Sequence, residues 1–253
     1  MSDQSHFWSK AAPRYEQEFI DPYLPDVRNP LRAAIADLAD PKHGVVADLG
    51  CGVGPLLPFL ASHFRRVVAV DFAEGMLTRA REECSGLKNV EFLRRCLTDL
   101  ENLKGQIDVA VAVNSLVLPD VGELDRALQS VHETLKPGDH FLGIVPAMDA
   151  VHYLTMLFLD RALAQGLPAV KARQNAAHHA EHELYNFAFG EFRYQGLEQH
   201  FWQPFEVRYR LKRAGFRRVR MTKVLLSWSQ FGLVGRDLLD QQPPWDWFFW
   251  AEA

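Results

Sequence analysis

The stretch Val45–Leu60, which reads VVADLGCGVGPLLPFL, decides how the rest of the chain is interpreted. An apolar run ends at the acid Asp48, and glycines follow at the alternate positions 50, 52 and 54. Pro55 then opens a predicted helix. One glycine is enough for a tight turn, so three of them predict a ligand that lies close to the backbone between the strand and the helix.

Strand and helix patterns alternate regularly from Gly44 to about Pro146. Short β-rich runs are separated by helical stretches, and the clearest helix follows residue 120, with apolar residues at steps of three and four. This helix is expected to end at Pro137-Gly138. The alternation predicts βαβ units, a parallel sheet and helices on both of its faces. The runs VVAVD and VAVAV are apolar throughout, as in strands that are buried on both sides.

A single domain is expected over residues 1–253, with four parts. Residues 1–43 form an N-terminal helical cover, and residues 44–146 form a cofactor-binding core. Residues 147–203 depart from the strand and helix rhythm and are rich in histidine and aromatic residues, so they are interpreted as a helical insertion or lid. Residues 204–253 supply a closing helix and two strands.

Composition indicates a soluble cytoplasmic protein. The net charge of -4 gives no reason to expect nucleic acid or an anionic membrane as a partner, and the basic cluster Arg208–Arg220 is explained by the exposed side of a helix and an edge strand. Cys51, Cys84 and Cys96 show no CxxC pairing, which favours a reduced setting. No signal peptide and no membrane span are predicted.

The acids near the glycines indicate which ligand is bound. The spacing G-x-G-x-G differs from the dinucleotide fingerprint G-x-G-x-x-G. A carboxylate at Asp48 repels phosphate and attracts an ammonium group, whereas Asp71, at the end of the next strand, suits ribose hydroxyls. A ribose without phosphate together with an ammonium group indicates S-adenosylmethionine and disfavours NAD.

In their order along the chain, these motifs resemble the class I S-adenosylmethionine-dependent methyltransferases, in their small-molecule branch of ubiquinone-biosynthesis-like type. The resemblance covers about residues 44–146 and extends more weakly to LKRAGF and the final strands. The motifs that carry it are VVADLGCGVGPLLPFLA, VVAVDFAEGMLTRARE, VEFLRRCLTDL, IDVAVAVNSLVLPDV and LKPGDHFLGIVP. It implies a Rossmann-like, doubly wound α/β fold whose seven-stranded, mostly parallel sheet has a final antiparallel strand, with a helical insertion here.

The resemblance also assigns the residues that bind S-adenosylmethionine. They are Asp48, Gly50, Cys51, Gly52, Gly54, Asp71, Phe72, Met76, Cys96, Leu97, Asn114 and Ser115. Within this set Asp71 bonds the ribose hydroxyls, and Phe72 and Met76 flank the adenine. Cys96 stands where the family often has an acid that binds the adenine amine, so Asp99 is considered as a replacement.

Methyl transfer from a sulfonium is an in-line displacement, so alignment matters most, and a base is needed only when the acceptor must lose a proton. Tyr15 is a candidate because its ring face could stabilise the sulfonium, although it could equally seat the N-terminal helix on the core. His178 and His182 are four residues apart, so they would share one face of a helix. Either could act as a general base, or both could belong to a solvated surface. No third ligand is evident, so no metal is expected.

The sequence therefore predicts a S-adenosylmethionine-dependent methyltransferase that acts on a small-molecule acceptor. Expected partners are that acceptor alone, without nucleic acid or membrane, in a monomer or homodimer. One alternative is a non-catalytic protein that binds S-adenosylmethionine or S-adenosylhomocysteine, for which the departure at Cys96 leaves room. An NAD-linked oxidoreductase is the other alternative, which the glycine spacing and Asp48 disfavour.

Overall fold

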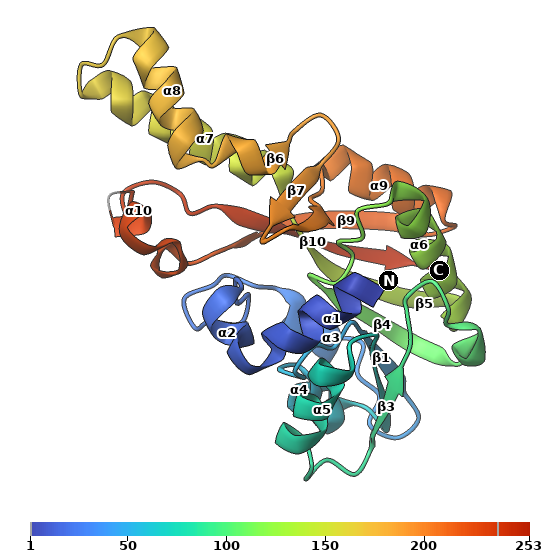
Figure 1. The fold of residues 1–253 in the computed structure, drawn as a ribbon. Coiled ribbons are helices and arrows are strands. Elements are labelled where there is room, and N and C mark those ends of the chain that lie inside the picture. Colours follow the sequence, from blue (N-terminus) through green and yellow to red (C-terminus); the bar gives the residue numbers. More distant parts are fainter. Residues whose placement is uncertain (1, 237) are drawn as a thin grey trace.

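The computed structural model describes residues 2–236 and 238–253, and Figure 1 shows a twisted sheet flanked by helices, with a helical arm at one end. The strands are β1 (Val45–Leu49), β2 (Arg66–Asp71), β3 (Val90–Arg94), β4 (Ile107–Val113), β5 (Leu135–Pro146), β6 (Tyr185–Asn186), β7 (Glu191–Tyr194), β8 (Leu197–His200), β9 (Arg217–Leu225) and β10 (Trp245–Glu252). The helices are α1 (Ser2–Ala11), α2 (Tyr15–Glu18), α3 (Leu31–Ala36), α4 (Leu57–His63), α5 (Glu74–Glu83), α6 (Val121–Thr134), α7 (Met148–Ala164), α8 (Ala169–His179), α9 (Pro204–Arg213) and α10 (Gly232–Arg236).

The main sheet has seven strands in the order β3-β2-β1-β4-β5-β10-β9. β1 pairs in parallel with β2 on one side and β4 on the other, while β10 runs antiparallel to both β5 and β9. The predicted doubly wound sheet with a final antiparallel strand is therefore confirmed. Because the chain order reverses between β1 and β4, the carboxyl ends of these two strands border the ligand-binding edge of such a sheet.

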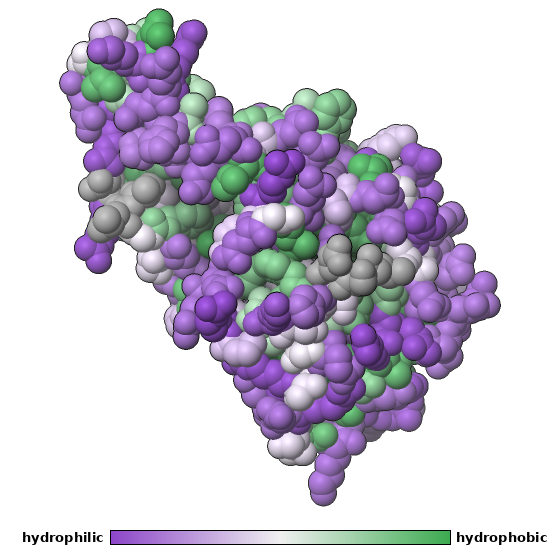
Figure 2. All heavy atoms as spheres, viewed as in Figure 1, coloured by the Kyte–Doolittle hydropathy of each residue, from purple (hydrophilic) through white to green (hydrophobic). Residues whose placement is uncertain are grey.

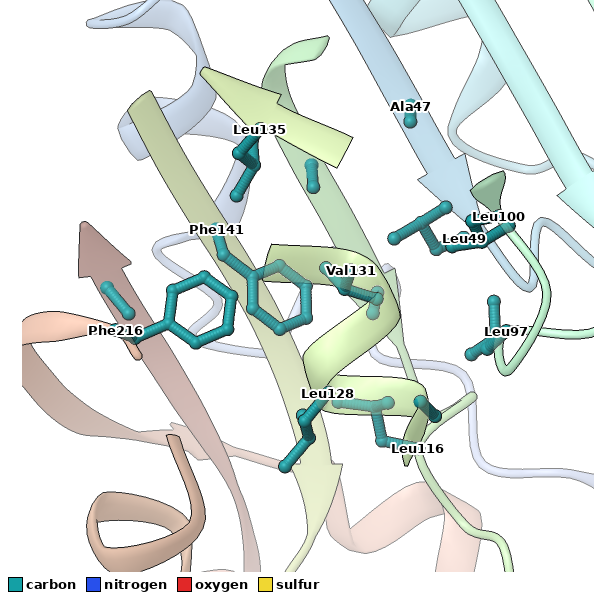
Figure 3. Packing of buried hydrophobic residues seen from close by; sticks show 14 of the residues in the cluster. Ala47, Leu49, Leu97, Leu100, Leu116, Leu128, Val131, Leu135, Phe141 and Phe216 are labelled. Carbon is teal, nitrogen blue, oxygen red and sulfur yellow. The ribbon is translucent and has the colours of Figure 1, made fainter. Parts of the chain in front are cut away.

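Apolar side chains fill both faces of the sheet. Ala47 and Leu49 of β1 join a cluster on the face that α6 and α9 cover, whereas Val46 joins the cluster under α3, α4 and α5. On the first face, Val131 of α6 packs in the same cluster as Phe141 of β5 (Figure 3). All five residues of β1 are buried, which explains the continuous apolar run in the sequence.

Helix α6 is shorter than the sequence predicted. It ends at Thr134 rather than at Pro137-Gly138. The reason is that Leu135 already pairs with Ile107 in the sheet, so strand pairing takes over before the proline is reached. At its other end the Asp120 carboxylate accepts a hydrogen bond from the backbone N–H of Glu123 at 2.6 Å, which is a regular N-cap.

The segment 147–203 is helical only in its first part. Helices α7 and α8 form the arm that projects from the body, and β6, β7 and β8 then form a separate three-stranded antiparallel sheet (Figure 1). The prediction of a helical insertion is wrong for this second part. Gln195 and Gly196 both have positive φ, at 49° and 80°, which suits the tight hairpin turn between β7 and β8.

The N-terminal segment lies on α5. The backbone N–H of Gly75 donates to the Ser9 hydroxyl at 3.2 Å, and a Cβ at position 75 would lie 2.6 Å from the Ser9 carbonyl oxygen. Further along, the Arg79 guanidinium donates to the Glu16 carboxylate at 2.9 Å. These contacts fix α1 and α2 beside the carboxyl edge of the sheet.

We predict that Gly143→Ala destabilises the protein by about 1–3 kcal/mol through overpacking. A Cβ at Gly143 would lie 2.4 Å from the Phe249 ring and 2.8 Å from the Ala112 carbonyl oxygen, and neither strand can move without its neighbours. The free energy of unfolding is measured by urea titration. The matched control is Gly86→Ala, where a Cβ meets nothing within 4 Å, and equal losses in the two variants would contradict this packing.

Candidate functional site

Two connected cavities open at the carboxyl edge of the sheet. The first, of about 140 Å³, is lined by Asp48 of β1 and by the N-terminal segment 15–23, and we call it the first chamber. The second, of about 250 Å³, is lined by Asp71 of β2 and by Leu97, and we call it the second chamber. Tyr15, Gly50, Gly52, Val113 and Asn114 line both chambers, so they mark the junction.

Each of the three glycines after β1 is required for a different reason. A Cβ at Gly50 would lie 2.2 Å from Cβ of Ser115, so this position is closed by the loop after β4. At Gly54 a Cβ would lie 2.9 Å from Leu57, and this glycine lines neither chamber. Only Gly52 has open space where a Cβ would be, with φ at +55°. A ligand can therefore approach the backbone at Gly52.

Asp71 is held by backbone hydrogen bonds at the end of β2. Its carboxylate accepts from the N–H of Gly52 at 3.0 Å and from the N–H of Ala73 at 2.8 Å. Asp71 therefore also caps the N-terminus of α5. The residue at the N-cap position, Ala73, has no side chain that could do so. Burial raises the pKa of Asp71, while the N–H donors counteract that rise. Asp71 lines the second chamber, as a ribose ligand requires.

Asp48 is buried without a partner. Its side chain is only 3% exposed, and no hydrogen bond or ion pair from the described residues reaches its carboxylate. Burial raises the pKa of Asp48 to about 7, and the negative charge of Asp71 adds to the rise. A buried carboxylate that faces a cavity in this way favours a cationic ligand.

Arg32 lies on the wall of the same chamber. Its guanidinium lies 5.3 Å from the centre of the Tyr23 ring and 5.7 Å from that of Phe59, and it forms no ion pair with the described residues. Arg32 is not predicted from the sequence, because no local motif distinguishes it from other surface arginines.

Three carboxylates line this chamber, those of Glu16, Asp21 and Asp48. Glu16 already pairs with Arg79, and Asp21 accepts from the backbone N–H of Tyr23. The free Asp48 carboxylate and the Arg32 guanidinium therefore match the ammonium and carboxylate of an amino acid.

The second chamber is apolar where an adenine is expected. Phe72, Met76, Cys96 and Leu97 all line it, as the sequence predicted. Asp99, which was considered as the missing acid, does not line it. Polar side chains reach this chamber instead from other elements, and they are Gln4, Arg95 and Glu123. None of the three was predicted. Gln4 and Glu123 are distant from the Cys96 motif in sequence, whereas Arg95 directly precedes Cys96 within it.

The junction itself carries Asn114, Ser115 and Tyr15. Asn114 has φ at +50°, and the Ser115 hydroxyl donates to the Leu49 carbonyl at 2.6 Å, so the loop after β4 is tied to β1. The Tyr15 ring stacks on Phe19 with centroids 5.2 Å apart. Burial, with the nearby acid Asp71, raises the pKa of Tyr15 to about 12, so this phenol is neutral near pH 7 and does not act as a resting base.

The two candidate histidines lie away from both chambers. Helix α8 ends at His179, and Glu181 has φ at +52°, so His178 and His182 do not share a helix face as predicted. His178 is exposed on the arm, and the His182 ring lies 3.2 Å from the Thr155 hydroxyl. Within residues 2–236 and 238–253, no group of three or more His, Cys, Asp or Glu side chains is placed to hold a metal.

Known proteins match the core of the chain. Residues 46–138 match the family described as a methyltransferase domain. The protein YqeM of Bacillus subtilis (strain 168) is 30% identical over 99 residues, and the demethylmenaquinone methyltransferase of Clavibacter sepedonicus is 36% identical over 105 residues. These matches span 38% and 42% of this chain and only 40% and 41% of the relatives' own lengths.

Solved structures extend the likeness over the whole fold. A Burkholderia thailandensis 1,6-didemethyltoxoflavin-N1-methyltransferase with bound S-adenosylhomocysteine has a TM-score of 0.64 at 15% identity, over 98% of this chain and 86% of that chain. An S-adenosylmethionine-dependent methyltransferase from Mesorhizobium loti has a TM-score of 0.58 at 20% identity, over 88% and 96%. These identities show the fold alone.

The core match and the shared fold agree with each other. Residues 46–138 match a methyltransferase domain, and the fold is that of solved S-adenosylmethionine-dependent methyltransferases, as the resemblance of the motifs predicted. Among the described residues, no helix is long and apolar enough to cross a membrane.

We predict that the ligand-free protein loses stability as pH rises from about 4 to about 7. The unfolded chain titrates Asp48 near 3.8 and the folded protein near about 7, so the folded state holds more protons in between and the free energy of unfolding falls with rising pH. Asp246 is buried with its pKa raised to about 7 and adds to the same slope. Each contributes at most ~1.4 kcal/mol per pH unit.

Urea titrations at several pH values measure this slope. Asp48→Asn should flatten the slope in part, since the amide does not titrate, while Asp246 and the other acids with raised pKa values, Asp71 and Asp139, retain the rest. Asp99→Asn, at an exposed side chain, should leave it unchanged. A slope that is identical in the wild type and Asp48→Asn would show that Asp48 is not a raised, buried acid.

Proposed function

We propose that this protein transfers a methyl group from S-adenosylmethionine to a small-molecule acceptor. The observation that carries the proposal is that Asp48 and Arg32, neither of which forms an ion pair with the described residues, both line the first chamber, which shares Gly52 with a second chamber that contains Asp71. An ammonium and a carboxylate on one side, and a ribose with an adenine on the other, are the chemical groups of that one cofactor.

The side chains present fit each part of this cofactor. Asp48 would bind the ammonium group and Arg32 the carboxylate, through charge-assisted hydrogen bonds. Asp71 would accept from the ribose hydroxyls, and the buried Met76, which is 2% exposed, would pack on the adenine. A dinucleotide fits less well, because a pyrophosphate at the glycine turn would lie beside the unpaired carboxylate of Asp48.

Alignment is the main task of these residues once the cofactor supplies its activated methyl group. The junction at Tyr15 and Asn114 lies between the two chambers, so it is where the sulfonium and its methyl group would be placed. The neutral ring of Tyr15 would favour the positive sulfur through its π face and would exclude water. No basic side chain lines the junction, which suits an acceptor that needs no base or that ionises unaided.

A small acceptor is supported by two relatives. One is named a demethylmenaquinone methyltransferase and the other a 1,6-didemethyltoxoflavin-N1-methyltransferase. The segment 147–203, which begins directly after β5, would cover the acceptor and contribute to its selection. The alternative of a binding protein without transfer activity differs in one testable respect, since it would bind the cofactor and never release S-adenosylhomocysteine from it.

We predict that Arg32→Ala weakens binding of S-adenosylhomocysteine by roughly ten-fold or more, at about 1.4 kcal/mol per decade, and leaves 5′-methylthioadenosine unchanged. The second compound has the adenosine but lacks the amino acid. Asp71→Asn should weaken both compounds by at least about ten-fold, because the ribose is common to them. Both affinities are measured by titration calorimetry, with Asp99→Asn as the control that changes neither.

Thermal shift with NAD and turnover assays complete this test. S-adenosylmethionine should raise the melting temperature while NAD does not, since only a ligand of the native state stabilises it. If Arg32→Ala weakens the two compounds equally, the assignment of the first chamber to the amino acid is wrong. If S-adenosylmethionine is bound but a panel of phenols, amines, thiols and carboxylates yields no S-adenosylhomocysteine, the binding-protein alternative is preferred.

A further inference from the structure

Asp246 is a buried acid that the proposed function does not use. The face of the molecule shown in Figure 2 is mostly hydrophilic, whereas Asp246, in β10, is only 6% exposed. It pairs with Pro146 at the end of β5, so it lies at the carboxyl edge of the sheet, where the two chambers open. Burial raises the pKa of Asp246 to about 7, and no charged side chain takes part in this shift. An ion pair therefore does not explain why an acid is buried here.

Two N–H groups at this edge donate to Asp246 instead. They belong to the backbone of Ala147, just before α7, and to the side-chain amide of Asn114, just after β4. Val113 pairs with Ile144, so Asn114 lies level with the end of β5. A carboxylate has an oxygen for each of the two donors, whereas an Asn side chain would have only one. The contact with Asn114 is thus a reason for a carboxylate at position 246.

Asn114 is held in place at the junction of the two chambers. Its φ of +50° is a left-handed conformation that is uncommon outside glycine, and its backbone N–H donates to the Ile144 carbonyl at 2.8 Å. The residue lines both chambers. Uncommon backbone conformations that the surrounding structure enforces cluster at functional sites.

The amide oxygen of Asn114 is a second, independent observation. This Oδ1 atom is buried and has no hydrogen-bond partner among the described residues. An ionised carboxylate only accepts, so the amide nitrogen of Asn114 faces Asp246 and the oxygen is turned away from it. A buried acceptor without a donor is destabilising. An N–H or O–H of a ligand at the junction would satisfy it.

The cofactor does not supply this donor. In the proposed arrangement the ammonium group lies at Asp48, the ribose hydroxyls lie at Asp71, and the adenine lies in the second chamber. The sulfonium and its methyl group, which would lie at the junction, carry no N–H or O–H. The donor therefore belongs to the methyl acceptor.

We propose that Asp246 is a positioning residue, which orients Asn114 so that its Oδ1 accepts an N–H or O–H of the atom that is methylated. This inference rests on the proposed function and narrows the acceptor to an amine or hydroxyl compound that still carries hydrogen on its reacting atom. A lone pair of that atom displaces the methyl group, the electron pair of the C–S bond stays on sulfur, and the proton leaves to water. A tertiary amine, a thioether or a carbon acceptor would leave Oδ1 without a donor.

Three ligands test the donor at the junction without an acceptor. S-adenosylhomocysteine has a neutral sulfur there, S-adenosylmethionine has a cationic methylsulfonium without N–H, and sinefungin has an ammonium group in place of the methylsulfonium. Only sinefungin can donate to Oδ1, so the wild type should bind it roughly ten-fold tighter than S-adenosylmethionine in titration calorimetry.

Two variants should each remove this preference. In Asp246→Asn the single amide oxygen serves Ala147, so the new NH₂ group faces Asn114 and turns its oxygen away from the junction. Asn114→Gly deletes the amide at a positive φ that glycine adopts without strain. The matched control is Asp139→Asn, at another acid with a raised pKa, near the start of β5, and it should keep the full preference.

Affinity for S-adenosylhomocysteine separates positioning from a structural role. Asp246→Asn should bind it as the wild type does and melt at the same or a higher temperature, because a buried charge is removed. Equal affinities of the wild type for sinefungin and S-adenosylmethionine, or a preference that survives in Asp246→Asn, would overturn the inference. Equal weakening of both cationic ligands in Asp246→Asn would also overturn it, since charge alone would then be at work. A wild type that binds none of the three ligands would instead overturn the proposed function.

Discussion

A buried carboxylate without a partner, Asp48, is the constraint on which the site depends. Burying a charge in a protein is expensive unless an opposite charge or several donors compensate for it. Asp71, a short distance away at the same edge, receives two backbone N–H groups, whereas Asp48 receives none. The pKa of Asp48 is raised because its carboxylate is buried without such donors. A bound cation would lower this pKa again, because it favours the charged carboxylate.

The fold provides both the burial and the access. β1 lies between β2 and β4, so the end of β1 is covered on both sides, and the cavity of the first chamber is the space that the Asp48 side chain faces. The turn that follows β1 is closed against Ser115 at Gly50 and packed on Leu57 at Gly54, which leaves Gly52 as the open position. The N-terminal segment, fastened to α5 through Ser9 and Glu16, then supplies the outer wall. These parts come from distant positions in the chain and meet only at the sheet edge.

Much of this arrangement could be predicted from the sequence, because its signals are local. The strands of the main sheet follow from short β-rich runs, of which β1, β2 and β4 are largely apolar, and the acids at strand ends follow from the position of each run. Gly54 was assigned to the cofactor because its spacing matches the motif. In the structure a glycine is needed there because a side chain would clash with Leu57. Arg32 was missed because its relation to Asp48 exists only in the folded chain. Strands of two to four residues in β6–β8 were missed because so short a pattern resembles helix or loop equally well.

The most direct test of the account is the number of protons exchanged when S-adenosylhomocysteine binds, measured by calorimetry in buffers of different ionisation enthalpy. At pH 7 the free carboxylate of Asp48, with its pKa at about 7, carries a proton in roughly half of the molecules, and an ammonium ligand favours the charged form. Binding should therefore release roughly half a proton at pH 7 and almost none at about pH 8.5. Asp48→Asn should abolish the release. Binding without proton release at pH 7, or with the same release in Asp48→Asn, would contradict the central role of this carboxylate.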